Sequence, residues 1–210
     1  MKHIIKNPEP APFSAWKSNF PTAKFTDMGN ERLFRGGATA KRALRCSLLD
    51  EQGGLCCYCE SRIAEPDFHI EHFRPKDTSL FPHLQLDYIN LHACCRAMPI
   101  GEPDDCCGHK KKNIFHEDLV SPLESDCATH FAYDMMGGIS STDARGATSI
   151  AILNLDSGAL RRSRRGLIEY FESLPEDELE EEINLHLAPN HNPLGEFYTT
   201  IYYLQANHLL

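Results

Sequence analysis

Apolar residues recur at intervals of three or four positions in four stretches of the chain, as they do along one face of an α-helix. The stretches are residues 38–52, 143–155, 157–173 and 196–210. Gly53 follows the first stretch, and a glycine suits the end of a helix because it tolerates a positive φ. Ser157 is suited to cap the third stretch. The pattern predicts four helices, with most of the helical structure after residue 142.

The remaining segments lack this period. Residues 7–22 are rich in proline and predict an extended arm, with Trp16 and Phe20 as its anchors. Residues 121–142 predict a loop that contains a hairpin near Gly137-Gly138, since paired glycines between apolar runs favour a tight turn.

Residues 55–120 combine Cys, His and Pro with short apolar runs. We expect two short strands near Phe68–Phe73, little regular structure until about Asp87, and a helix that begins near His109. This part has too little apolar content to fold alone, so a bound metal is expected to organise it.

Composition is that of a folded chain, with 41% hydrophobic and 24% charged residues among 210. No apolar run approaches the roughly 20 residues of a membrane span, and the first residues do not resemble a secretory signal. We therefore expect a cytoplasmic protein with no membrane contact, in which clustered cysteines are metal ligands before they are disulfides.

The formal net charge is −9, whereas a protein that binds nucleic acid unaided is usually basic. Any contact with nucleic acid must come from a local basic patch or from a partner. Residues 176–182 contain six acidic residues with only Leu179 between them. A solvated helix face or loop explains such a run, and the alternative is docking onto a basic partner.

Seven of the nine cysteines lie in three clusters, Cys56-Cys57-Tyr58-Cys59, Cys94-Cys95 and Cys106-Cys107. Four thiolates can close a tetrahedral zinc site, and the pair Cys56 and Cys59 has the spacing for two of them. Each later doublet is expected to give one ligand and one bystander. Buried free cysteines would not explain the clustering, and redox chemistry through Cys56 and Cys59 lacks a thioredoxin-like βαβ context.

A Glu71-His72 step lies between the first and second clusters, Asn90 precedes the second, and His109 follows the third. Hydrolysis of a phosphodiester needs a base for water and a cation for the developing charge. His72 suits the base, Glu71 and His109 suit one divalent cation, and Asn90 suits the orientation of His72 or its loop. His69 is a weaker candidate for a role in the site, because it can be simply a residue of the predicted strand.

Basic residues flank these positions. Arg74, Lys76, Lys110 and Lys111 are candidate phosphate contacts in spite of the acidic total.

This arrangement resembles the HNH nuclease superfamily, whose core is a ββα-metal unit. Glu71-His72 matches its acidic residue and base histidine, Asn90-Leu91 its middle motif, and His109 its last metal ligand. The same register implies Cys95 and Cys107 as zinc ligands beside Cys56 and Cys59. Eleven residues separate Cys95 from Cys107, and the last histidine is two positions beyond the cysteine and not adjacent to it, so Asn113 is the alternative last ligand.

The chain is most similar to the Septu-type and retron-associated HNH proteins, the PtuB-like group. The similar segments run over about residues 50–170 and include Ile70–Lys76, Cys107–Lys111, Leu119–Leu123 and Ile152–Asp156. The resemblance implies an antiphage effector that works with an ABC-type ATPase, in some systems beside a reverse transcriptase.

We therefore predict an α+β fold in which a small zinc-stapled ββα core is embedded in a mostly helical domain. Residues 1–52 form an N-terminal arm and helix, residues 53–120 the core, and residues 121–210 a helical region for partner docking. The leading hypothesis is an HNH endonuclease with structural Zn²⁺ and catalytic Mg²⁺ or Mn²⁺, acting on DNA or RNA. The alternative is a catalytically silent zinc module that binds nucleic acid or docks an ATPase.

Overall fold

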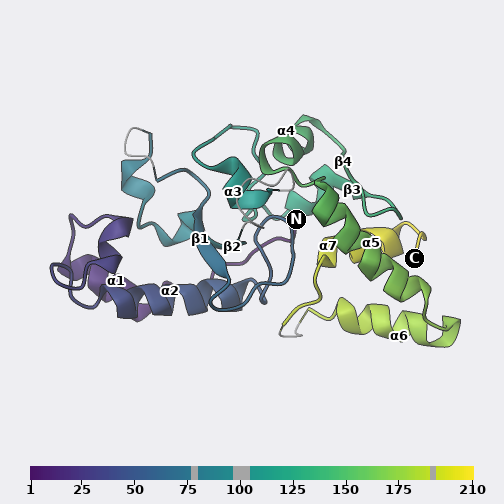
Figure 1. Cartoon of the computed structure of the whole chain (residues 1–210), viewed down its shortest axis with the longest axis horizontal. Coiled ribbons are helices and arrows are strands. Elements are labelled where there is room, and N and C mark those ends of the chain that lie inside the picture. The colour runs from purple at the N-terminus through teal and green to yellow at the C-terminus, as the bar shows by residue number, and fades with distance from the viewer. Residues whose placement is uncertain (77–79, 97–104, 190–192) are drawn as a thin grey trace.

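The computed structural model describes residues 1–76, 80–96, 105–189 and 193–210. Within these ranges the chain forms seven α-helices and two separate two-stranded antiparallel sheets. The helices are α1 (Ala11–Asn19), α2 (Gly37–Glu51), α3 (Cys107–Lys111), α4 (Ala144–Leu153), α5 (Gly158–Glu172), α6 (Glu176–His186) and α7 (Tyr198–Ala206), and the strands are β1 (Phe68–His72), β2 (Leu91–Cys95), β3 (Phe131–Tyr133) and β4 (Ile139–Ser141). The molecule is elongated, with α1 and α2 toward one end and α5, α6 and α7 toward the other (Figure 1).

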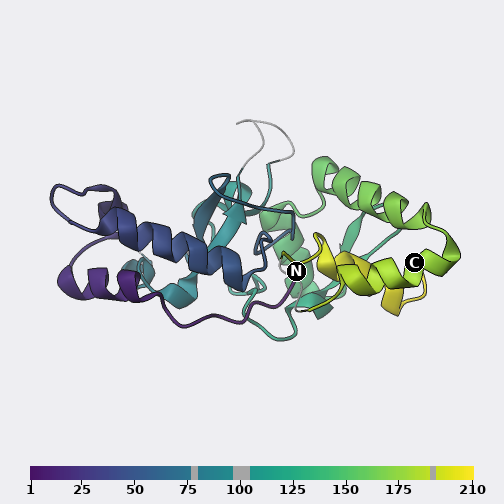
Figure 2. The same cartoon turned by 90° about the horizontal axis from the view of Figure 1, so that it is seen from below.

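The proline-rich residues near the start form helix α1, so our prediction of an extended arm is wrong. Pro10 is the N-cap and Pro12 lies in the first turn, where a missing N–H costs no helical hydrogen bond. Helix α1 packs along α2 (Figure 2) and buries Trp16, which confirms Trp16 as an anchor. Helix α2 lies where the apolar period predicts it.

Strands β1 and β2 form an antiparallel pair in which Phe68 is opposite Cys95 and His72 is opposite Leu91. We expected both strands near residues 68–73, but only β1 lies there. Four of the five residues of β2 are buried, so no alternation of polar and apolar positions marks this strand in the sequence.

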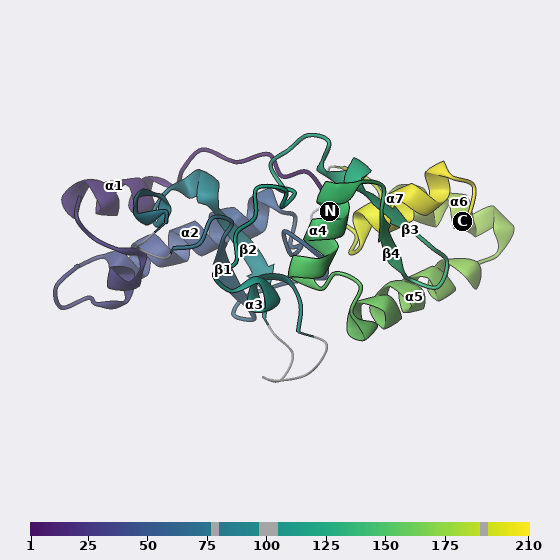
Figure 3. The same cartoon turned by 90° about the horizontal axis from the view of Figure 1, so that it is seen from above.

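Helix α3 packs against β2 and against α4 (Figure 3). Because side chains alternate along a strand, Glu71 shares with His69 the face of β1 that Gly108 of α3 approaches, and His72 points to the opposite face. The chain order β1, β2, α3 places a hairpin and a helix together within an α+β fold, as predicted; the zinc within it remains a prediction.

The C-terminal part follows the predicted pattern. The hairpin β3–β4 and the helices α4, α5 and α7 form where the sequence predicts them, and the Ser157 hydroxyl caps α5 by accepting the Leu160 N–H at 3.3 Å. Helices α5, α6 and α7 share a second apolar core around Phe171 and Ile201. The acidic run begins α6 and is mostly exposed, as expected of a solvated face. None of the described helices is long and apolar enough to cross a membrane.

Candidate metal centre and active site

The cysteine clusters meet beside the β1–β2 hairpin. The sulfurs of Cys56, Cys94, Cys95 and Cys107 lie within 4.8 Å of one another. Cys56 Sγ is 3.8 Å from Cys94 Sγ, and Cys59 Sγ is 3.9 Å from Cys95 Sγ. Zn–S bonds of about 2.3 Å place the sulfurs of a tetrahedral site roughly 3.8 Å apart. The spacing of these thiols therefore fits a zinc ion.

The group of four contains three of the predicted ligands, Cys56, Cys95 and Cys107, and Cys94 where we predicted Cys59. Cys59 belongs to a tight turn that the Glu60 N–H closes by donating to the Cys56 carbonyl at 3.1 Å. Cys94 Sγ accepts the Gly108 N–H at 3.4 Å, a contact that would also stabilise a metal-bound thiolate. The fourth position thus has two candidates, and Cys59 stays a prediction.

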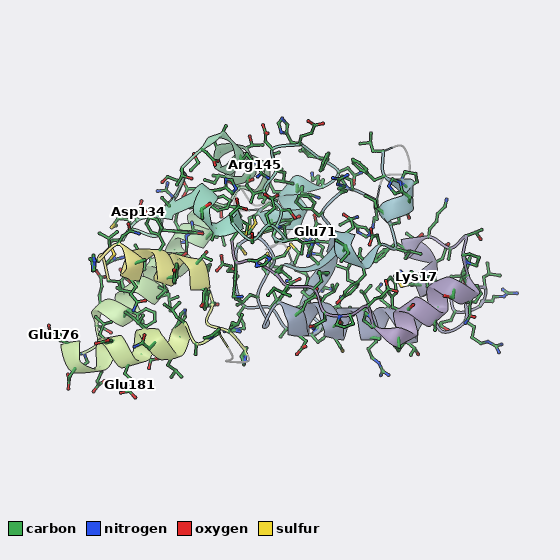
Figure 4. All side chains as sticks on the ribbon, turned by 180° about the vertical axis from the view of Figure 1, so that it is seen from behind. Lys17, Glu71, Asp134, Arg145, Glu176 and Glu181 are labelled. Carbon is green, nitrogen blue, oxygen red and sulfur yellow. The ribbon has the colours of Figure 1, made fainter. Side chains whose placement is uncertain are left out.

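A separate pocket of about 300 Å³ brings together the predicted base and the predicted ligands of the catalytic metal, while Asn90 lies outside its lining. Glu71 and His72 line it from β1, and His109 and Asn113 line it from α3 and the turn that follows. Figure 4 places Glu71 near the middle of the molecule, far from the acidic helix marked by Glu176 and Glu181.

His72 is buried and held in one orientation. Its Nε2 lies 3.1 Å from the Gln85 carbonyl oxygen, and the ring of Phe25 packs edge-on at 4.6 Å between centroids. Because a carbonyl only accepts, Nε2 carries the proton and Nδ1 has the lone pair. Burial lowers the pKa of His72 to about 4, so the ring is neutral near pH 7.

Asn90 fixes the loop that follows β1. Its Oδ1 accepts the Arg74 N–H at 2.8 Å, and its Nδ2 donates to the Arg74 carbonyl at 2.9 Å and to the Leu84 carbonyl at 3.1 Å. Leu84 precedes Gln85, whose carbonyl holds His72. The Asn90 amide therefore links the loop after β1 to the segment that holds the imidazole, and its orienting role in catalysis stays a prediction.

Glu71 is an ionised, buried carboxylate. Burial alone would raise its pKa, but hydrogen bonds and charge from His69 and Lys111 hold the pKa below the usual value. Lys111 Nζ donates to Glu71 Oε1 at 2.7 Å and to the His72 carbonyl at 2.9 Å, and its side chain has no exposed surface. The expected phosphate contact by Lys111 is therefore corrected: a fully buried ammonium that neutralises Glu71 cannot reach a phosphate outside.

His69 is the residue of this pocket whose role the sequence left open. Its Nε2 lies 3.3 Å from Glu71 Oε2, and its ring is 4.8 Å from the His109 ring, nearly perpendicular to it. The thiol of Cys94 and the carboxylate of Glu71 outweigh burial and raise the pKa of His69 to about 10. The signal that could have found it is the spacing His69-x-Glu71, which places both side chains on one face of a strand.

The other three predicted phosphate contacts, Arg74, Lys76 and Lys110, have exposed side chains. The Arg74 guanidinium lies 5.4 Å from the ring centroids of both Phe81 and Phe115, which orient it without removing it from solvent. Lys76 lines the pocket beside His72. Whether these residues touch phosphate remains a prediction.

A second group of possible ligands, Glu124, Asp126 and His130, lies outside this region. Arg145 already donates to both carboxylate oxygens of Glu124 at 2.7 and 2.8 Å, and Asp143 holds His130 Nδ1 at 2.6 Å. The ion pairs Arg145–Glu124 and His130–Asp143 therefore account for the positions of Glu124 and His130 without a metal ion.

No protein-family model matches the chain. Over 138 residues, 61% of the chain, it is 30% identical to a protein of Vibrio cholerae serotype O1 biovar El Tor named "Retron Vc95 putative HNH endonuclease", of which the match covers 65%. Over 142 residues, 64% of the chain, it is 28% identical to the Septu protein PtuB of Bacillus thuringiensis, of which the match covers 47%. The chain is related to these retron and Septu proteins.

The predicted resemblance to Septu-type and retron-associated HNH proteins is thereby confirmed. Each match covers less than two thirds of the relative's length. The names support an HNH nuclease, while metal dependence, substrate and partner are matters of proposal.

Proposed function

We propose that the chain is a metal-dependent HNH endonuclease that hydrolyses phosphodiester bonds in nucleic acid, as an effector of a bacterial antiphage system. The observation that carries the proposal is the neutral His72 imidazole, fixed by the Gln85 carbonyl in a pocket that also holds the ionised Glu71. A module that only binds nucleic acid has no need of an oriented base beside a carboxylate.

In this proposal His72 is the general base. With Nε2–H donated to Gln85, the Nδ1 lone pair takes the proton of the attacking water. A pKa of about 4 makes the imidazole a weak base in the absence of substrate charge. The negative charge of a bound phosphodiester stabilises the imidazolium and raises that pKa toward neutrality.

Glu71 and His109 are the proposed ligands of a divalent cation, Mg²⁺ or Mn²⁺, with Asn113 as the alternative to His109. Lys111 engages Glu71 Oε1 at 2.7 Å, and Oε2 has the longer contact of 3.3 Å with His69, so Oε2 is the proposed metal-binding oxygen. When bound, such an ion neutralises the charge that develops on the phosphate and stabilises the leaving oxygen. Arg74, Lys76 and Lys110 would hold the flanking phosphates.

A structural zinc on Cys56, Cys59, Cys95 and Cys107 would fix α3 to the hairpin, since these ligands come from the turn after α2, from β2 and from α3. Cys94 is the alternative to Cys59.

The proposed partner is an ABC-type ATPase, in some systems beside a reverse transcriptase. The net charge of −9 opposes unaided binding to nucleic acid, so a partner would deliver the substrate. Residues 121–210, with the exposed acidic face of α6, are the proposed docking region.

The test is a cleavage assay on the protein purified alone and with the products of its neighbouring genes. Plasmid DNA and total RNA are each incubated with Mg²⁺, with Mn²⁺ and with EDTA. Metal-dependent cleavage of one substrate class by the wild type, lost in His72→Ala, supports the proposal. Absence of cleavage in every combination, or equal cleavage by the wild type and His72→Ala, contradicts it.

A further inference from the structure

His69 lines the pocket, although it is not among the predicted metal ligands. His69 and Glu71 leave β1 on the same face, and His69 Nε2 is 3.3 Å from Glu71 Oε2, the oxygen that Lys111 leaves unengaged. A separation of 3.3 Å suits two ligands of one cation, because metal–ligand bonds of about 2 Å place neighbouring ligand atoms roughly 3 Å apart.

Helix α3 has a glycine, Gly108, where it approaches His69 and Glu71. A Cβ on Gly108 would lie 2.4 Å from Glu71 Oε2 and 2.6 Å from His69 Nε2, closer than real Cβ contacts allow. A residue with any side chain at position 108 would therefore occupy the space in which the two groups meet. His109, the next residue along the helix, brings its ring to 4.8 Å from that of His69, so two imidazoles and a carboxylate line the same pocket.

From this arrangement we propose that His69 is a ligand of the catalytic divalent cation, together with Glu71 and His109. The cation would take the place of the proton that His69 Nε2 shares with Glu71, and that proton would leave to solvent. Gly108 is required to make room for the cation. The inference rests on the proposed function, because it concerns the metal of that site. It assigns a ligand that strand β1 supplies two residues before the Glu71-His72 step.

The rival explanation is that His69 only orients Glu71 through their hydrogen bond. His69→Gln separates the two roles, because glutamine keeps a similar length and an N–H donor for Glu71 but offers no imidazole nitrogen. His116→Ala is the matched control, since His116 is exposed and does not line this pocket.

The experiment uses the zinc-loaded full chain with Mn²⁺ as the probe. Isothermal titration gives the dissociation constant, and pulsed EPR detects ¹⁴N nuclei of imidazoles bound to Mn²⁺. We expect His69→Gln and His69→Ala to weaken Mn²⁺ binding by about 10-fold or more and to reduce the ¹⁴N modulation, with His116→Ala unchanged. Zinc content and circular dichroism establish that each variant is folded.

Two outcomes overturn different claims. In the first outcome, Mn²⁺ binds the wild type, Glu71→Ala abolishes binding, and His69→Gln keeps the wild-type affinity and ¹⁴N signal. His69 is then not a ligand, and this inference fails while the proposed metal site stands. If Glu71→Ala leaves Mn²⁺ binding unchanged, the catalytic metal site of the proposed function fails, and the inference falls with it.

Discussion

At the scale of single residues, two neighbouring side chains of the pocket have different surroundings and different charge states. Glu71 and His72 are neighbours in β1, yet one faces Gly108 of α3 and the other the Gln85 carbonyl. Glu71 is kept ionised by His69 and Lys111, and His72 is kept neutral by burial. The proposed metal ligand and the proposed base can therefore be neighbours in β1 without forming an ion pair with each other.

We predict that His72→Ala removes cleavage without removing structure. The variant loses the base but none of the candidate zinc thiolates, so folding, zinc content and partner binding should survive while cleavage falls by about 10² to 10⁴-fold. Glu71→Ala should instead weaken cation binding, so raised Mn²⁺ should restore part of its activity. Cleavage assays on variants of verified zinc content measure this; full activity in His72→Ala would end the assignment of this pocket as a nuclease site.

A second prediction concerns His92, which is fully buried and has no hydrogen-bond partner on either ring nitrogen among the residues that the structure describes. Burial, and to a lesser degree the positive charges of Lys6 and Lys111, hold its pKa far below 6.5. Below about pH 6.5, His92 is protonated in the unfolded chain but stays neutral in the folded chain. The free energy of unfolding therefore falls as pH falls, by roughly 2 kcal/mol between pH 6.5 and 5.

His92→Leu should remove that part of the pH dependence. The measurement is urea unfolding of both proteins at pH 7.5 and 5.0, with the exposed His83→Leu as a control that also accounts for acid-driven zinc loss. Equal losses of stability in the wild type and His92→Leu would show that His92 is not the group responsible.

At the scale of elements, β1, β2 and α3 hold the site because cysteines and one lysine join them. Cys107 begins α3, Cys94 and Cys95 end β2, and Lys111 at the end of α3 reaches back to Glu71 and the His72 carbonyl. A helix of five residues is too short to be stable by itself, so these links determine its position.

Serine substitutions should identify the fourth zinc ligand. If the set is Cys56, Cys59, Cys95 and Cys107, then Cys59→Ser gives insoluble or zinc-free protein and Cys94→Ser is nearly silent, because zinc binding contributes on the order of 10 kcal/mol or more to folding in small zinc modules. Elemental analysis of soluble protein measures one zinc per chain or none. Zinc loss in Cys94→Ser with retention in Cys59→Ser would exchange the two roles, and absence of zinc from soluble wild type would refute the site.

The neighbouring lysines of α3 should behave differently. Lys111→Ala leaves Glu71 buried without its cation and should destabilise the fold by about 3 kcal/mol or more, seen as a lower melting temperature. Lys110→Ala changes only an exposed side chain, so the fold should be unaffected and binding to nucleic acid weaker. A Lys111→Ala protein as stable as Lys110→Ala would mean that the buried pair contributes nothing.

At the scale of the whole molecule, charge and shape separate two regions. The candidate nuclease pocket lies near the middle of an elongated chain, and the exposed acidic face of α6 lies toward one end (Figures 1 and 4). Near the pocket, the exposed basic residues are Arg74, Lys76 and Lys110. Their attraction for phosphate is opposed by the net charge of −9 on the whole chain. Such a molecule is suited to receive its substrate from a partner.

We therefore predict weak binding of duplex DNA by the isolated chain, because affinity depends largely on neutralised phosphates. Titration by fluorescence anisotropy at physiological salt should give no nanomolar complex, and the partner should restore binding. Lysine substitutions at Glu178 and Glu181, both exposed on α6, should weaken partner binding and leave zinc content unchanged. Nanomolar binding of DNA by the chain alone would refute this view of substrate delivery.

The sequence by itself determined the features that depend on local order. The periods of α2, α4, α5 and α7, the Ser157 cap and the β3–β4 hairpin follow from the spacing of apolar and turn residues, and the relation to Septu and retron proteins follows from short motifs. The proline content of residues 7–22 argues against a helix there, yet α1 forms because the first turn of a helix tolerates proline.

Only the tertiary structure decided what depends on contacts between distant segments. Strand β2 has no alternating pattern because it is buried on both faces, so its pairing could not be predicted from the sequence. Lys110 and Lys111 have the same charge in the sequence, but packing of α3 against β2 and α4 exposes one and buries the other against Glu71. His69 enters the pocket because the strand register and the missing side chain of Gly108 place it there, which is a property of three-dimensional packing.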